Sequence, residues 1–236
     1  MRLYAKSWLA LKNNIFLLPI PMLADLLTIV LLLYFNMIYR NTTIQHYSNL
    51  FISTMQAQPA ASELASIIAS TLLLYTAIYI VYTLLQSASW YWSYKFCNLS
   101  HTFLNILKHY SLYNILWLVL LMAVTVLNKL LLINSTFAGV QPKLITPISG
   151  IFYFIISYFA IVSYLMQPVK TGIKKGNIII SVLFLIWVTY LVLDYFAFLS
   201  GNISQIMGII VSMLILLPFF SWARIYLILA MKEVLK

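Results

Sequence analysis

Long apolar stretches are the feature that most constrains how this chain can fold. A helix of ~20 mainly apolar residues is long enough to cross the hydrocarbon core of a bilayer. Only 8% of the residues are charged, whereas soluble domains carry about 25%. We therefore predict an all-α polytopic membrane protein, a single domain over residues 1–236 with six transmembrane helices in three hairpins. The predicted spans cover residues 15–39, 64–87, 112–133, 145–167, 178–200 and 206–228.

Polar segments separate several of these apolar stretches. The sharpest are RNTTIQHYSN after the first stretch, NSTFAGVQPK after the third and MQPVKTGIKKGN after the fourth. Clusters of polar residues with Gly or Pro between periodic segments are typical of loops. We therefore expect the chain to leave its helices at these three places.

The basic residues predict how the chain lies across the membrane. With the N-terminus inside, eleven of the fourteen lysines and arginines fall on the inner side, and only Arg40, Lys129 and Lys143 fall outside. Cytoplasmic loops carry such an excess of bases, so we predict a cell-membrane protein with both termini in the cytoplasm. The bases lie at the ends of apolar runs, which argues against nucleic acid as a partner despite the net charge of +10.

Residues 88–111 predict an amphipathic helix at the inner surface. One face carries apolar residues at helical spacing: Phe96, Leu99, Phe103, Leu107 and Tyr110. The opposite face includes a set that we call the docking face: Lys95, His101, Asn105 and Lys108. Such a helix lies in the interface with its bases toward anionic headgroups. It is either a lipid-facing collar or a docking surface for a cytoplasmic partner, and residues 2–11 could form a second, shorter helix of this kind.

Asp25 is the one charged residue in the middle of the first span. On a helix it shares a face with Pro21, Thr28, Leu32 and Asn36. A charge at the bilayer centre costs about 3 kcal/mol and is tolerated when it is paired or hydrated. Two interpretations stay open: a cation or proton site beside a broken helix, as in transporters, or a structural carboxylate bonded to a neighbouring helix.

The prolines Pro19 and Pro21 bear on the same choice. They remove two backbone donors, so they could open the first turns of the span beside Asp25. They could equally mark the place where the span begins.

Other charged residues are candidate partners. Arg224, near the inner end of the last span, is the inner base that could reach toward Asp25. Lys129 and Asp194 lie at similar depth near the outer ends of their spans, so we expect a Lys129–Asp194 ion pair. Arg40 and Glu63 flank the first outer loop and could pair in the same way.

Ser–aromatic steps end each predicted hairpin near the inner surface. They are Ser89-Trp90, Ser163-Tyr164 and Ser221-Trp222. The steps could reflect a threefold internal repeat, or only the usual composition of membrane boundaries.

Enzyme motifs are missing from the sequence. There is no HExxH, no Gly-rich phosphate loop and no GxSxG. Cys97 is the one cysteine, and the three histidines lie outside the predicted spans. We therefore predict a protein that is not an enzyme, with no metal site and no cofactor.

Two layouts resemble this chain. The segment Ser7-Trp8-Leu9-Ala10-Leu11-Lys12-Asn13-Asn14 leading to Pro19, together with Lys174-Lys175-Gly176, resembles the six-span membrane domain of glycerophosphodiester phosphodiesterases. The hydrolase domain of those proteins is absent here, so this resemblance implies a membrane domain without catalytic residues. The amphipathic first segment and the inner helix after the second span are also similar to the permease subunit of exporter-type ABC transporters. The acidic motif usual in the inner loop of those permeases is missing.

Two functions therefore remain in view. The first is a non-catalytic membrane subunit that scaffolds or anchors a larger complex, with other membrane or cytoplasmic subunits as partners. The second is a transporter or ABC-type permease subunit that uses Asp25. The substitution Asp25→Asn separates them, because it should abolish flux in the second case and change only stability or assembly in the first.

Overall fold

A computed structural model describes residues 2–55, 61–137, 145–165, 173–201 and 204–234. These residues form seven α-helices and one short 3-10 helix, which confirms the all-α prediction. In chain order the elements are α1 (Arg2–Asn13), η1 (Ile15–Leu17), α2 (Pro19–Met55), α3 (Ala61–Phe96), α4 (Phe103–Phe137), α5 (Ile145–Tyr164), α7 (Gly176–Gly201) and α8 (Gln205–Val234).

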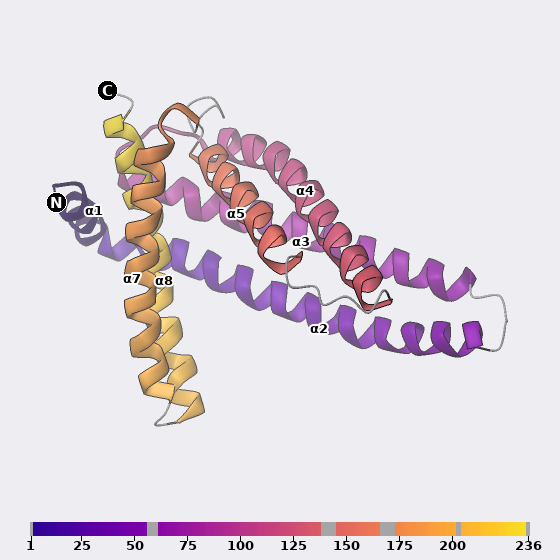
Figure 1. Ribbon diagram of the computed structural model, residues 1–236. Coiled ribbons are helices and arrows are strands. Elements are labelled where there is room, and N and C mark those ends of the chain that lie inside the picture. The colour runs from indigo at the N-terminus through magenta and orange to yellow at the C-terminus, as the bar shows by residue number, and fades with distance from the viewer. Residues whose placement is uncertain (1, 56–60, 138–144, 166–172, 202–203, 235–236) are drawn as a thin grey trace.

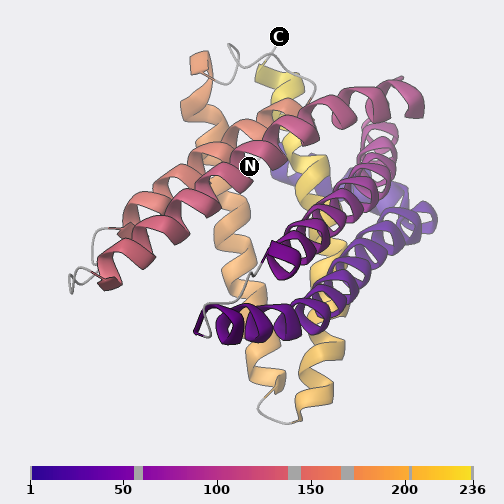
Figure 2. The same ribbon diagram turned by 90° about the vertical axis from the view of Figure 1, so that its right-hand side faces the viewer.

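Three helix pairs diverge from one end of the molecule (Figures 1 and 2). These pairs are α2 with α3, α4 with α5, and α7 with α8, and each pair is in direct contact. Both ends of the chain lie at the end from which the pairs diverge. We call the buried side chains there the hub; its members include Leu11, Trp90, Tyr94, Ile106, Tyr110, Val162, Ile179, Trp222 and Ile225.

Helix α8 is the central element of the hub. It contacts α1, α2, α3 and α7, and most of its residues from Phe219 to Met231 are buried. Small hydroxyl residues are buried among these helices and α5, and six serines have no exposed surface: Ser7, Ser87, Ser89, Ser93, Ser163 and Ser221. Small residues at helix interfaces let backbones approach closely and supply hydrogen bonds between helices. The hub is therefore tightly packed although it contains many polar groups.

Five of the helices are long and apolar enough to cross a membrane, which indicates an integral membrane protein. They match five of the six predicted spans, with the apolar parts running over Ile15–His46, Ala65–Phe96, Phe103–Val124, Gly176–Phe196 and Met207–Glu233. The predicted span 145–167 corresponds to α5, whose apolar described part, Gly150–Tyr164, falls short of that length. Six spans remain a prediction.

The predicted loop RNTTIQHYSN is helical, which corrects the first hairpin. Helix α2 continues through it to Met55, so 37 residues form one helix of about 55 Å. The hydroxyls of Thr42 and Thr43 donate to backbone carbonyls one turn earlier and fit inside the helix. Across the pair, Tyr39 bonds Thr71 and His46 bonds Glu63. These side-chain contacts stabilise a helix in a segment whose polar composition predicts a loop.

The prediction of one helix over 88–111 is wrong. Residues 88–96 are the end of α3, and α4 begins at Phe103. Asn98 has a φ of 54°, and the amides of Asn98 and Leu99 donate to the carbonyls of Lys95 and Tyr94. This is the Schellman arrangement that ends a helix, with asparagine in the left-handed position. The amide of Asn105 then bonds the Thr102 hydroxyl, which caps α4.

Helix α1 forms over the segment expected to be helical. It packs on α8, and the rings of Tyr4 and Trp8 contact Trp222. Part of its apolar face therefore meets protein rather than lipid. Lys12, Lys95 and Lys232 stand in the last turns of α1, α3 and α8, where positive charge stabilises a helix end.

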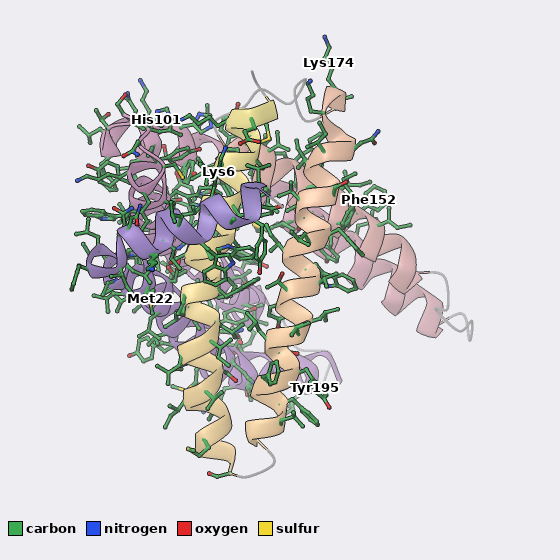
Figure 3. All side chains as sticks on the ribbon, turned by 90° about the vertical axis from the view of Figure 1, so that its left-hand side faces the viewer. Lys6, Met22, His101, Phe152, Lys174 and Tyr195 are labelled. Carbon is green, nitrogen blue, oxygen red and sulfur yellow. The ribbon has the colours of Figure 1, made fainter. Side chains whose placement is uncertain are left out.

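The labelled basic residues gather at the hub end. Figure 3 places Lys6, His101 and Lys174 toward this end and Tyr195 toward the opposite end of α7. The arrangement agrees with the uneven distribution of bases along the sequence. The assignment of this end to the cytoplasm remains a prediction.

Cys97 follows the last residue of α3 and is buried in the hub. Burial raises the pKa of its thiol to about 12, although the positive charge of Lys232 acts in the opposite direction. The thiolate is the reactive form, so at pH 8 roughly one native thiol in ten thousand is reactive. We expect maleimide labelling of Cys97 to be negligible in the folded protein and rapid after denaturation, as measured by mass shift. Rapid labelling of the folded protein would contradict this burial.

Candidate functional site: a buried Asp25–Arg224 pair

Helix α2 brings Asp25 into the hub. The helix begins at Pro19, where a missing backbone donor costs nothing because the first amides of a helix have no partner within it. The prolines therefore mark the start of the helix rather than a break within a span. Asp25 follows less than two turns later and points at α8. It is 3% exposed.

Arg224 of α8 meets Asp25 in a two-point ion pair. Its Nη1 donates to Oδ1 of Asp25 at 3.0 Å, and its Nη2 donates to Oδ2 at 2.6 Å. Arg224 is itself 7% exposed. The planar guanidinium matches a carboxylate in this arrangement, which is the strongest ordinary form of such a pair. The pair joins residues that are 199 positions apart in the chain.

Helix α3 supplies most of the surrounding polar groups. Ser89 donates to Oδ1 of Asp25 at 2.9 Å, and the amide of Gln86 donates to the same oxygen at 3.3 Å. The Nε of Arg224 donates to the Ser93 hydroxyl at 3.2 Å. On α8 itself, Ser221 accepts from Nη2 at 3.4 Å. Both charged groups are therefore hydrogen-bonded on several sides, which is the condition for burying them.

This geometry is that of a clamp between helices. The carboxylate oxygens are taken up by a guanidinium, a hydroxyl and an amide. Asp25 thus has little capacity left to bind a cation from outside. The arrangement connects α2, α3 and α8 and fixes their relative positions.

Thr28 and Asn36 are the other predicted members of this site, and only Thr28 lies near the ion pair. Thr28 is buried and donates to the Ala24 carbonyl, and Gln86 approaches it at 3.4 Å. Thr28 therefore lies at the edge of the clamp. Asn36 is exposed and lies about 16 Å further along α2 than Asp25, so it is not part of the site.

Two ion pairs were predicted away from the hub, one between Arg40 and Glu63 and one between Lys129 and Asp194. Glu63 pairs with His46 at 2.6 Å rather than with Arg40, because α2 continues past Arg40. The side chain of Lys129 lies outside the described residues, and Asp194 is exposed on α7. The described ends of α4 and α7 lie apart in both views (Figures 1 and 2). The Lys129–Asp194 pair stays a prediction that this arrangement does not favour.

The four residues of the docking face lie around the turn between α3 and α4. Lys95, Asn105 and Lys108 are exposed, and His101 is partly exposed with its ring against Tyr94. The ammonium of Lys95 lies 4.6 Å from the centre of the Trp92 ring. The face therefore exists as a surface, although a turn rather than one helix builds it.

A second polar network, which the sequence did not reveal, closes the end of α5. The hydroxyls of Tyr94 and Tyr110 donate to the Tyr164 carbonyl at 2.9 and 2.6 Å. Nε2 of His109 bonds the Ser163 carbonyl at 2.8 Å. The last carbonyls of a helix have no partner within it, so these donors satisfy the end of α5. The network has a structural explanation.

Two buried serines on α3 provide a matched test of the clamp. Ser89 bonds Asp25, whereas the hydroxyl of Ser87 has no partner among the described residues, and neither serine is exposed. A hydrogen bond to a charged group stabilises by about 1.5–3 kcal/mol, and an unpaired buried hydroxyl stabilises nothing. We expect Ser89→Ala to lower the free energy of unfolding in detergent by about 2 kcal/mol. Ser87→Ala should leave it unchanged or raise it slightly, and equal effects would contradict the clamp.

No three His, Cys, Asp or Glu side chains in the described part of the chain are grouped so that they could hold a metal ion. Five helices that are long and apolar enough to cross a membrane, three of them joined by a buried ion pair and its hydrogen bonds, define the class of this protein as a helical, multi-pass membrane protein. Searches of protein families, curated proteins and solved structures find no match to this chain.

Proposed function

We propose that this chain is a non-catalytic membrane subunit that scaffolds or anchors a larger membrane complex. The observation that carries the proposal is the Asp25–Arg224 clamp, in which the one carboxylate central to a span binds another helix of the same chain. Intramembrane charges are functional by default, and here the function that fits the geometry is to fix the helices. A rigid hub from which helix pairs diverge suits a protein that holds others in place.

The transport alternative requires a carboxylate that can exchange its partner. Asp25 is 3% exposed and its two oxygens accept bonds from Arg224, Ser89 and Gln86. A cation would have to displace the guanidinium, which would leave Arg224 buried without a counter-charge. The energetic penalty for such an unpaired charge is large, so this geometry favours the scaffold.

The proposal includes the topology. We place six spans in the cell membrane with both termini in the cytoplasm, because the hub end carries the termini and labelled basic residues. The docking face then meets the cytoplasm, where it is available to a soluble or peripheral subunit. This layout is similar to the six-span membrane domain of glycerophosphodiester phosphodiesterases.

Purification from the native host in mild detergent, followed by mass spectrometry of the proteins that come with it, tests the proposal. Subunits of a membrane complex should co-purify, and the double variant Lys95→Glu/Lys108→Glu should lose the cytoplasmic ones. The control is Arg40→Glu, an exposed base on α2 away from the hub. Co-purification of an ATPase would favour the permease instead, and a protein that purifies alone would contradict a scaffold.

A further inference from the structure

A pocket of about 490 Å³ lies at the hub end where α1, α3 and α8 finish. Ligand pockets usually measure about 300–1,000 Å³, so it is large enough for part of a small amphiphile. The pocket lies outside the Asp25–Arg224 clamp and shares no residue with it. Figure 3 shows Lys6, one of its lining residues, where α1 passes α8.

The polar lining consists of cations and amides. Lys6 of α1 and Lys232 of α8 both line the pocket, together with Asn13, Asn14 and Asn98. Lys6 is also paired with Glu233 at 2.8 Å, but these two side chains are 59% and 42% exposed. Exposed pairs of this kind are weak, so Lys6 can turn to a ligand at little cost.

The electrostatic balance around the pocket is positive. Three helix C-termini meet there, and each is equivalent to about half a negative charge. Lys12 and Lys95, in the last turns of α1 and α3, add to Lys6 and Lys232. Among the described residues near these helix ends, four ammonium groups stand against one carboxylate, Glu233, and the partial charges of three helix ends, so positive charge is in excess. A negatively charged ligand would reduce this excess.

The remaining lining is apolar and indicates a lipid rather than a free anion. Leu9, Phe96 and Leu229 line the pocket beside the lysines. Leu9 is 60% exposed although it is a large apolar residue. The adjoining α3 and α8 are candidate membrane spans, so in a bilayer we expect the pocket to lie where phospholipid headgroups meet the first carbons of the chains.

We propose that this pocket binds one anionic phospholipid. Its phosphate lies between Lys6 and Lys232 and accepts from the amides of Asn13 and Asn98. The glycerol and the start of a chain lie against Leu9 and Leu229. The inference requires insertion in a membrane but does not rest on the scaffold function.

Native mass spectrometry of the full chain in mild detergent, titrated with phosphatidylglycerol, tests the site. Lys6→Gln/Lys232→Gln should weaken the first binding event about tenfold, because two charge-assisted bonds are lost. The control Lys174→Gln/Lys175→Gln removes two exposed lysines at the same end, outside the pocket, and should change binding by less than about twofold. Glu233→Gln frees Lys6 and should strengthen binding about twofold.

Three outcomes would overturn the proposal. An equal loss in the two double variants would show a general attraction of the basic end for anionic lipid. Equal binding of zwitterionic phosphatidylcholine would show that charge does not select the ligand. Displacement of the lipid by millimolar inorganic phosphate would show that the pocket takes a free anion without its chain.

Discussion

Replacing Arg224 by methionine should lower the free energy of unfolding by about 3–5 kcal/mol, because it leaves Asp25 buried without its partner. Methionine keeps most of the length and flexibility of the arginine side chain. The carboxylate retains its bonds from Ser89 and Gln86, but neither supplies a positive charge. Unfolding by sodium dodecyl sulfate in mixed micelles, followed by tryptophan fluorescence, measures the change.

The double variant Asp25→Leu/Arg224→Met identifies the origin of that loss. Replacing a buried ion pair by apolar residues is often neutral, although Ser89, Ser93 and Gln86 would lose their partners here. We expect the double variant to recover about half of the stability lost by Arg224→Met. Lys6→Met breaks the exposed Lys6–Glu233 pair and serves as the control, with little change expected.

The same double variant separates the two functions. If the clamp only positions helices, a double variant that folds should still co-purify with its complex. If Asp25 carries a transported cation, the double variant should fold and yet lose activity. Loss of complex assembly in a stable double variant would contradict the scaffold proposal.

The membrane-spanning helices were predictable because hydropathy is a local property. The pairing of Asp25 with Arg224 was also predictable, since few charged residues fall inside the spans and each needs a counter-charge. The hydroxyls and the amide that surround the pair could not be predicted, because nothing in the sequence distinguishes Ser89 from Ser87. Only the rotation of α3 decides that Ser89 reaches Asp25. In retrospect, Gln86, Ser89 and Ser93 share a helical face, which is a weak sign of a polar contact.

Helix ends were the least predictable feature. The apolar periodicity of 88–111 continues through the turn, whereas the break depends on Asn98 in a left-handed conformation. The Ser–aromatic steps do converge in the hub, since Ser89, Ser163 and Ser221 are all fully buried there. Their bonds nevertheless differ: Ser89 donates to Asp25, Ser163 accepts from Trp117, and Ser221 accepts from Arg224. Shared burial with different partners favours common boundary composition over a strict repeat.

Trp222 is the side chain through which α1 is held to α8. It has no exposed surface, and its ring stacks on Trp8 and Tyr226 with centroids 5.6 and 5.4 Å apart. Its Nε1 donates to the Ser7 hydroxyl at 2.9 Å. Trp8 and Ser7 both belong to α1, so the ring and its Nε1 join α8 to α1, while Tyr226 is one turn away on α8 itself. The position of α1 therefore depends on a residue of α8.

Trp222→Ala should lower the free energy of unfolding by about 3–5 kcal/mol, the usual loss for a large aromatic side chain removed from a core. Because the cavity opens under α1, that helix should separate before the rest of the molecule unfolds. Limited proteolysis should then cut within residues 2–13 at a protease concentration that leaves the wild type intact. Trp187→Ala, at a tryptophan 54% exposed on α7, is the control and should change neither stability nor cleavage.

Trp222→Phe distinguishes stacking from the hydrogen bond. Phenylalanine keeps an aromatic ring against Tyr226 but cannot donate to Ser7, which would lose one of its two hydrogen-bond partners. The loss should be about 1–2 kcal/mol, from one buried hydrogen bond and a smaller ring. If α1 is held mainly by stacking, this variant keeps its N-terminal segment protected from protease. If cleavage matches that of Trp222→Ala, the bond to Ser7 is what holds α1, and the aromatic contacts only fill the space around it.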